Sequence, residues 1–278
     1  MAKIKSMLKS AIRLLKEEKK VAVPVPINAT ALLEGKVALI TGGSGGIGFA
    51  MAQSFIKSGC KVVIAGTSES KLKACCEEVG GENIVPLVID VTDVKAMPEK
   101  VQMAAGMFPE NRLDILVNSA GVVNQTDFLS ISEQEYDRVM DINAKGTFFM
   151  SKAMAQYMIK NGINGHILNV SSSSALRPAW TPYQMSKWAV RGFTLGLSDT
   201  LLPYGIVVNA IAPGPVATPM LGKRKGDNIY HETSPSGRYA LPEEIAALAT
   251  FMVSDMGKLI VGDTFYMTGG SGTISCHR

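Results

Sequence analysis

The chain has 278 residues, of which 46% are hydrophobic and 19% are charged, so it can bury one sizeable core and its composition argues against wholesale disorder. Its formal net charge of +4 lies near the amino terminus, where residues 1–20 hold seven basic residues against two acidic ones, and the nearly neutral remainder offers no basic surface for nucleic acid. The four cysteines have no metal-like or C-x-x-C spacing and no run of about 18 uncharged apolar residues occurs, so we expect a cytoplasmic protein with reduced thiols, no bound metal and no transmembrane segment.

The first predicted element is an amphipathic helix over residues 3–20, followed by a linker over residues 21–34. Apolar residues recur there at helical spacing with lysines between them, at Ile4, Leu8, Ala11, Ile12 and Leu15. Two prolines in the linker cannot continue a helix. We expect residues 1–34 to precede one dinucleotide-binding catalytic domain over residues 35–278. The helix is interpreted as an appendage packed on the body or on a neighbouring subunit. Peripheral contact with an anionic membrane surface is the alternative, and its two glutamates weaken a third reading as a presequence.

From residue 36 onward, compact apolar segments alternate with segments of helical periodicity. The predicted strands are residues 36–41, 61–65, 84–89, 113–118, 166–170, 206–211 and 264–267. The predicted helices are residues 46–57, 68–79, 94–107, 133–160 and 181–202. Strands that are apolar throughout and separated by helices indicate a parallel sheet covered on both faces. The predicted fold class is therefore α/β, a single domain with a doubly wound parallel sheet of about seven strands and helices on both faces.

A glycine-rich turn follows the first strand directly, with the sequence Thr41-Gly42-Gly43-Ser44-Gly45-Gly46-Ile47-Gly48. Glycines allow a backbone to turn sharply and to approach a pyrophosphate without obstruction by side chains. The helix that follows offers free N–H groups and a positive dipole end to the phosphates. Between a strand and a helix, this turn predicts a dinucleotide site contacted by Gly42, Ser44, Gly45, Gly46, Ile47 and Gly48.

The end of the second strand bears on which nicotinamide dinucleotide is bound. NAD-binding units usually place an acidic residue there, which holds the ribose 2′-hydroxyl. Here the strand ends in Ala65-Gly66-Thr67-Ser68, without a carboxylate that would repel a 2′-phosphate. Thr67 and Ser68 could donate hydrogen bonds to that phosphate, and Lys71 could add a positive charge. The sequence favours NADP over NAD only slightly, because no arginine stands at the end of this strand and Glu69 lies nearby.

Two more strand ends carry candidate cofactor contacts. Asp90 and Val91 end the third strand, and Asn118-Ser119-Ala120-Gly121 ends the fourth. Open α/β sheets bind ligands at the carboxyl ends of their strands, so we expect Asp90, Val91, Asn118, Ala120 and Gly121 to contact the cofactor. Asp90 could instead cap the next helical turn, and the two roles are compatible.

The chemical site is predicted from Tyr183 and Lys187, four residues apart and early in a helix, a spacing that places them on one helix face. A neighbouring ammonium favours the phenolate and would bring the pKa of the tyrosine, ordinarily about 10, towards neutral pH. The serines at 171–174 end the preceding strand, and a hydroxyl there could bond to a substrate carbonyl. A serine nucleophile would need a base, and none of the three histidines has a convincing partner, so a hydrolase is disfavoured.

Taken together, these segments resemble the short-chain dehydrogenase/reductase family, in its compact one-domain Rossmann subgroup. The resemblance covers about residues 35–272. It rests on motifs in the family order: Thr41–Gly48, Asp90, Asn118–Gly121, Asn143, Ser171–Ser172, Tyr183, Lys187 and Asn209–Gly214. It implies reversible hydride transfer between NAD(P) and a ketone or secondary alcohol. The alternative is a catalytically silent nucleotide-binding or membrane-docked scaffold protein on the same fold.

The resemblance implies a role for each matching residue. Tyr183 would be the general acid in reduction and the base in oxidation. Lys187 would hold the nicotinamide ribose and lower the pKa of Tyr183, and Asn143 would position a water that links Lys187 to solvent. Ser172 matches the family serine but stands 11 residues before Tyr183, closer than the family usually has it, so Ser171 and Ser173 stay open as alternatives. The residues expected to flank the nicotinamide are Pro213, Gly214, Val216 and Thr218.

The sequence leaves the substrate open among a 3-oxoacyl thioester, a sugar acid or polyol, and a cyclic hydroxy compound. Arg177, in the loop before Tyr183, could anchor a carboxylate or phosphate, and a plain surface arginine is an equal interpretation. Residues 215–240 are expected to form a lid. The family associates through the helices corresponding to residues 133–160 and 181–202, so we expect a homotetramer, with a dimer as the alternative.

Overall fold

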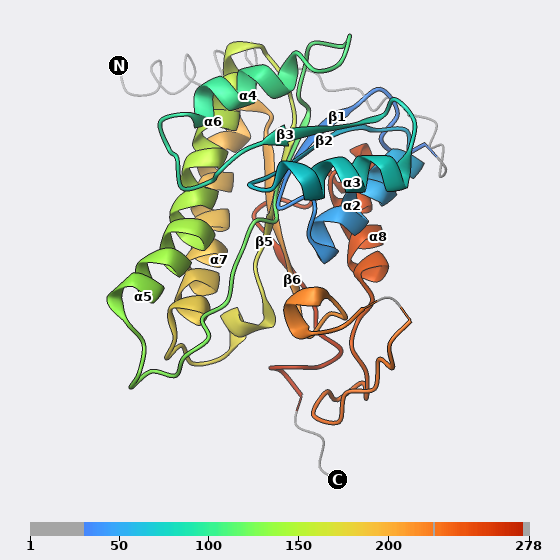
Figure 1. Cartoon of the computed structure of the whole chain (residues 1–278). Coiled ribbons are helices and arrows are strands. Elements are labelled where there is room, and N and C mark those ends of the chain that lie inside the picture. Colours follow the sequence, from blue (N-terminus) through green and yellow to red (C-terminus); the bar gives the residue numbers. More distant parts are fainter. Residues whose placement is uncertain (1–30, 225, 275–278) are drawn as a thin grey trace, which may run out of the picture.

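The computed structural model describes residues 31–224 and 226–274, and in this part of the chain seven parallel strands form one sheet in the order β3-β2-β1-β4-β5-β6-β7 (Figure 1). The strands are β1 (Val37–Thr41), β2 (Lys61–Gly66), β3 (Ile84–Val88), β4 (Ile115–Asn118), β5 (His166–Val170), β6 (Val207–Pro213) and β7 (Thr264–Met267). The chain runs outward from β1 to β3 and then returns to place β4 on the other side of β1. This reversal opens a crevice at the carboxyl ends of β1 and β4, where doubly wound sheets bind ligands. The predicted fold class is confirmed.

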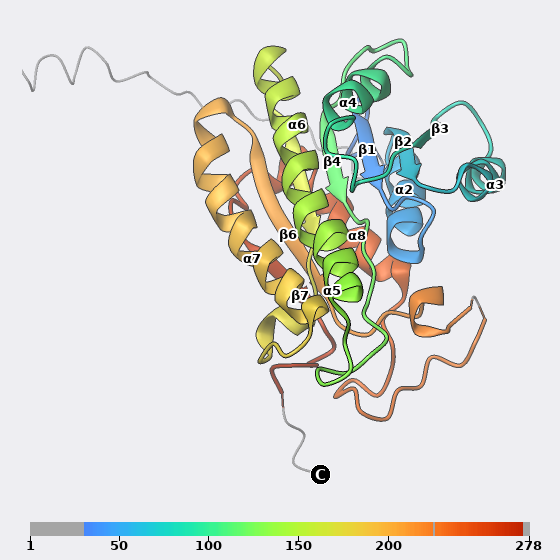
Figure 2. The ribbon, with the colours of Figure 1, turned by 60° about the vertical axis from the view of Figure 1, so that its left-hand side comes forward.

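Helices cover both faces of the sheet, as the two views show (Figures 1 and 2). They are α2 (Gly46–Lys57), α3 (Glu69–Val79), α4 (Met97–Ala105), α5 (Glu133–Met140), α6 (Thr147–Lys160), α7 (Pro182–Leu201) and α8 (Pro242–Met252). The helices α4, α6 and α7 pack on one face, and α2, α3 and α8 pack on the other. None of the helices in the described residues is long and apolar enough to span a membrane.

The apolar side chains of the central strand β1 contribute to two hydrophobic cores, one on each face of the sheet. Val37 and Leu39 point into the core beneath α4 and α6, whereas Ala38 and Ile40 point into the core beneath α2 and α8. Successive side chains of a strand alternate between its faces, so a strand covered on both sides must be apolar at every position. All four side chains are fully buried.

The predicted long helix over residues 133–160 is interrupted. After α5 the chain forms a π-helix over Asp141–Gly146 before α6 begins at Thr147. A π-turn holds an extra residue and so rotates every later side chain about the helix axis relative to those before it. Asn143 lies inside this π-turn, which sets the direction of its side chain.

The structure also adds a helix that the sequence interpretation lacked. The helix α8 spans Pro242–Met252, and its start carries a proline in the first turn followed by Glu243 and Glu244. Proline at the first helical position and early acidic residues are a helix start signal, so the sequence did contain evidence for it. The expected helix over residues 3–20 lies outside the described residues. Leu33, at the end of the expected linker, is fully buried and its N–H donates to the carbonyl of Ser58.

Candidate active site

A cleft of about 870 Å³ opens along the carboxyl ends of the central strands. Its walls come from the turn between β1 and α2, the ends of β2, β4, β5 and β6, the first turns of α7 and the segment after β6. Every predicted cofactor residue except Asn118 lines this cleft, and so do Ser172, Tyr183 and Lys187. Distant parts of the chain therefore meet where the strand order reverses.

The turn between β1 and α2 is a tight cradle that excludes side chains. Gly42 has a φ of +65°, and its carbonyl accepts the N–H of Gly45. A Cβ atom on Gly46 would lie 2.5 Å from Cγ2 of Thr218, and one on Gly48 would lie 2.4 Å from the carbonyl oxygen of Gly42. No side chain caps the start of α2, and Gly45, Gly46 and Ile47 at this helix start line the cleft, where an anion could bind the free N–H groups.

At the far end of the cleft, polar groups follow β2 and β3. Thr67, Ser68 and Lys71 line the cleft, and the hydroxyl of Ser68 also accepts the N–H of Lys71 as the cap of α3. One carboxylate oxygen of Asp90 accepts both the N–H of Thr92 (2.9 Å) and its hydroxyl (2.7 Å). Asp90 thus lines the cleft and stabilises the turn after β3 at the same time.

Asn118 does not line the cleft, contrary to the sequence expectation. It is buried, and its side-chain amide donates to the hydroxyl of Ser151 (2.9 Å) and to the Asn169 side chain (2.8 Å). Asn169 in turn donates to the hydroxyl of Thr194, so the network joins β4, β5, α6 and α7. The side chain of Asn118 therefore lies in the interior of the domain, and Ser119, Ala120 and Gly121 form this part of the cleft wall.

The first turns of α7 carry the predicted chemical groups. Thr181 and Gln184 form a capping box that fixes the start of the helix, so Tyr183 and Lys187 project one turn apart. The Nζ atom of Lys187 lies 5.7 Å from the centre of the Tyr183 ring and donates to the carbonyl of Val170 (2.9 Å). Both residues thus lie against the end of β5.

The structure distinguishes the neighbouring serines. The hydroxyl of Ser172 lines the cleft and accepts the N–H of Ser174 (3.1 Å), and among the neighbouring serines only Ser172 acts to lower the pKa of the Tyr183 phenol. The hydroxyl of Ser171 turns the other way and donates to the carbonyl of Lys187 (3.0 Å). Ser173 lines the cleft within the 3-10 turn that begins there, without a side-chain bond to Tyr183. Ser172 is therefore the hydroxyl placed beside the phenol, despite the short loop.

Burial changes the predicted acidity of both groups on α7. The sequence predicts that Lys187 lowers the pKa of Tyr183, but burial raises the pKa of Tyr183, and the hydrogen bond from Ser172 offsets this only in part. Burial also lowers the pKa of Lys187 to about 8. The free-energy cost of removing the phenolate and the ammonium from water exceeds the stabilisation that neighbouring groups give these charged forms. Desolvation therefore sets the direction of both pKa shifts.

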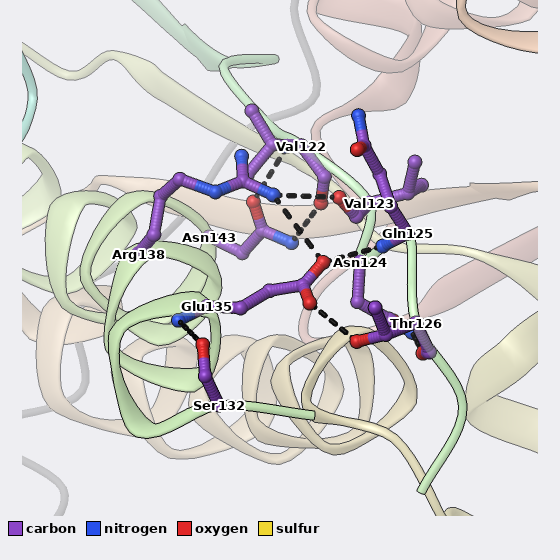
Figure 3. Close-up of polar contacts among 9 residues, drawn as sticks. All are labelled: Val122, Val123, Asn124, Gln125, Thr126, Ser132, Glu135, Arg138 and Asn143. Atoms are coloured by element: carbon purple, nitrogen blue, oxygen red, sulfur yellow. Dashed lines mark hydrogen bonds and ion pairs between the residues drawn. The ribbon is translucent and has the colours of Figure 1, made fainter. Parts of the chain in front are cut away.

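Asn143 lies behind the cleft rather than in its wall. Its carbonyl oxygen accepts the N–H of Val122 and its amide donates to the Val122 carbonyl, each at 2.9 Å (Figure 3). The amide also donates to the hydroxyl of Ser186 (3.1 Å). A Cβ atom on Gly121 would lie 3.4 Å from the oxygen of Asn143 and 3.7 Å from Nζ of Lys187, so these two polar groups converge at Gly121.

The remaining wall follows β6. Pro213, Gly214, Val216 and Thr218 all line the cleft, and Val216 pairs with Ala240 in an isolated parallel bridge that closes the expected lid segment. The sequence interpretation missed several further lining residues. These include the apolar side chains of Val122, Val123, Ile142, Met220 and Leu221, and also Ser271. No motif marks them, because their place depends on how distant loops pack together.

Comparison with known proteins agrees with this geometry. The family model for short chain dehydrogenases matches residues 36–228. The chain is 36% identical over 247 residues to a 3-oxoacyl-[acyl-carrier-protein] reductase of Thermotoga maritima, covering 86% of this chain and 98% of that protein. It is 35% identical over 246 residues to the 2-dehydro-3-deoxy-D-gluconate 5-dehydrogenase of Dickeya dadantii, covering 86% and 96%.

Solved structures show the same similarity. The crystal structure of a 3-ketoacyl-(acyl-carrier-protein) reductase from Brucella melitensis complexed with NADH matches with a TM-score of 0.79 at 31% identity, covering 87% of this chain and 100% of that one. Together with the cleft and the matched segment, these relatives show that the chain belongs to the short-chain dehydrogenase/reductase family and is an NAD(P)-dependent oxidoreductase that acts on an alcohol or ketone group.

Proposed function

We propose that the protein catalyses reversible carbonyl reduction with Tyr183 as the proton donor. The observation that carries this proposal is that Ser172, Tyr183 and Lys187 line one cleft, with the Nζ atom of Lys187 5.7 Å from the centre of the Tyr183 ring. Because burial raises the pKa of Tyr183, the phenol keeps its proton at neutral pH, as a general acid must.

Each polar residue of the site has its own role in the proposed reduction. When bound, a reduced nicotinamide would supply the hydride for the carbonyl carbon. Tyr183 donates its phenolic proton to the carbonyl oxygen, and the Ser172 hydroxyl holds that oxygen by a hydrogen bond. Lys187, with a pKa of about 8, is able to give up and regain a proton near neutral pH and so to reprotonate Tyr183. Asn143, which converges with Lys187 at Gly121, is proposed to hold the water that completes this path. Oxidation reverses each of these transfers.

The cleft fits a nicotinamide dinucleotide. The glycine turn and the uncapped start of α2 suit the pyrophosphate, because an added Cβ atom would meet Thr218 or the Gly42 backbone. Thr67, Ser68 and Lys71 line the far end, and no carboxylate stands at the end of β2. We propose on this basis that NADP is preferred to NAD.

The substitution Gly66→Asp tests the cofactor preference. A Cβ atom at this position would meet nothing closer than the hydroxyl of Ser44 at 3.6 Å, so an aspartate fits without displacing the backbone. Its charge should weaken NADPH binding by about a hundredfold and leave NADH binding nearly unchanged, since like charges within a few ångströms repel strongly. Fluorescence titration of both cofactors measures this. A wild-type protein that prefers NADH would contradict the proposed preference.

The substrate is tested directly. The relative from Thermotoga maritima is named for reduction of a 3-oxoacyl group and the one from Dickeya dadantii for a keto sugar acid, so both classes belong in the first assay. We propose to measure NADPH oxidation at 340 nm with acetoacetyl coenzyme A, with a keto sugar acid and with a cyclic ketone. Turnover of any of these supports carbonyl reduction, whereas cofactor binding without turnover of a wide ketone panel would favour the silent binding protein.

We further propose that the protein forms homo-oligomers through α6 and α7. A shallow groove between these helices is lined by Phe148, Phe149, Val190 and Phe193, and Phe148 is 46% exposed although it contacts both other rings. Exposed apolar surface of this kind marks interaction sites. Phe148→Glu should shift the protein to a smaller species in sedimentation velocity. The proposal fails if wild-type protein is a monomer at micromolar concentration.

A further inference from the structure

The loop that follows β4 is held by two polar side chains of α5, one from its first turn and one from its last. The Glu135 carboxylate accepts the N–H of Gln125 and the hydroxyl of Thr126, while Nη2 of Arg138 donates to the carbonyl of Val123 at 3.0 Å (Figure 3). These two side chains and the loop segment 123–126 are called the Glu135 clamp below. The two side chains also lie within 4.0 Å of each other as an ion pair.

The clamp continues directly into the cleft wall. Val122 and Val123 line the cleft, and Val122 is the residue that Asn143 holds by two hydrogen bonds. From residue 122 to residue 126, the loop is therefore bound by three side chains from one helical stretch. Asn143, which lies within the π-turn Asp141–Gly146, points its side chain towards the same loop (Figure 3).

Beyond Val123, burial of apolar side chains does little to hold this loop in place. Residues 119–129 form neither helix nor strand, and the largest apolar side chains beyond the clamp, Phe128 and Leu129, are 67% and 92% exposed. A loop without buried anchors takes its conformation from its hydrogen bonds, and charge-assisted bonds are the strongest of these. The clamp supplies such bonds from a carboxylate and a guanidinium.

We infer that Glu135 and Arg138 are positioning residues for the reaction, because the clamp fixes Val122 and Val123, which line the cleft and would form part of the surface for the ketone. This inference rests on the proposed function. The wall bears Val122, whose backbone is also the partner of Asn143, so a shift of the loop moves the substrate surface and loosens Asn143 together. Misplacement of a substrate by about 1 Å is enough to reduce turnover by roughly a hundredfold.

Glu133 provides a matched control for Glu135. Both glutamates lie in the first turn of α5, so both interact equally with the positive end of the helix dipole. Glu133 is exposed and makes no side-chain hydrogen bond or ion pair within residues 31–224 and 226–274. An effect seen in Glu135→Ala but not in Glu133→Ala therefore reports on the clamp.

The full-length variants Glu135→Gln, Glu135→Ala and Glu133→Ala are compared with the wild type in two measurements. Hydrogen exchange of peptides covering residues 122–131 should be at least tenfold faster in Glu135→Ala, less affected in Glu135→Gln, which keeps one acceptor oxygen, and unchanged in Glu133→Ala. With the ketone that the wild type reduces best, kcat/KM should fall at least tenfold in Glu135→Ala, with a lower kcat, because both the ketone surface and Asn143 move. The dissociation constant of NADPH should change less than twofold, because the clamp lies away from the phosphate cradle.

Each outcome decides the inference. Equal exchange in Glu135→Ala and Glu133→Ala would show that the clamp does not hold the loop, and faster exchange with an unchanged kcat/KM would show that it is only structural. Either result overturns the inference while leaving carbonyl reduction intact. If the wild type reduces no ketone, the proposed function fails, and the exchange comparison still decides whether the clamp holds the wall.

Discussion

Replacing Tyr183 with phenylalanine should slow carbonyl reduction by about a thousandfold, which is the usual contribution of a positioned general acid. The substitution removes the phenolic hydroxyl and keeps the aromatic ring, whose centre lies 5.7 Å from the Nζ atom of Lys187. Cofactor binding should therefore stay within twofold of the wild type. Steady-state reduction of the best ketone and fluorescence titration with NADPH measure the two effects separately.

Tyr157 offers a control for the same chemical change. It is another buried tyrosine, on α6, and its hydroxyl donates to the carbonyl of Asn111 at 3.5 Å, away from the cleft. Tyr157→Phe should retain nearly full activity. Near-normal turnover by Tyr183→Phe would show that another group protonates the carbonyl oxygen, and the assignment of Tyr183 as the proton donor would then be withdrawn.

Lys187→Met should abolish most activity and at the same time stabilise the fold. Burial lowers the pKa of Lys187 from 10.5 to about 8, so the folded protein holds a desolvated ammonium whose hydrogen bond goes to the carbonyl of Val170. Each unit of pKa shift corresponds to about 1.4 kcal/mol. After allowance for the lost hydrogen bond, the free energy of unfolding at pH 7 should rise by about 2 kcal/mol.

The pH dependence of this gain follows from the sign of the shift. The pKa of Lys187 is lower in the folded state than in the unfolded state, so between about pH 8 and 10.5 the unfolded chain binds more protons and the wild type gains stability as pH rises. The advantage of Lys187→Met should accordingly be constant below about pH 8 and shrink above it. Guanidinium unfolding at pH 7 and pH 9.5 measures this, with Lys152→Met on the exposed side of α6 as the control. If Lys187→Met were less stable than the wild type at both pH values, burial of the Lys187 ammonium would not destabilise the folded protein, and this prediction would be wrong.

The sequence by itself determined the features that depend on neighbouring residues. The apolar run of β1, the glycine turn before α2 and the spacing of Tyr183 and Lys187 are all local patterns. Each pattern fixes a backbone shape or a helix face wherever the segment lies. Since parallel strands present their carboxyl ends at one edge, these patterns also predicted the edge of the sheet at which the cleft lies.

Only the tertiary structure decided which side chains reach that site. Asn118 sits at the correct strand end, yet Ser151 and Asn169 draw its side chain into the interior. The serine beside Tyr183 is Ser172 because Ser171 bonds to the helix backbone instead. Side-chain direction and burial depend on partners that come from distant parts of the chain, and no local spacing encodes them. For the same reason the pKa of Tyr183 is raised, where the neighbouring lysine in the sequence predicted a lowered one.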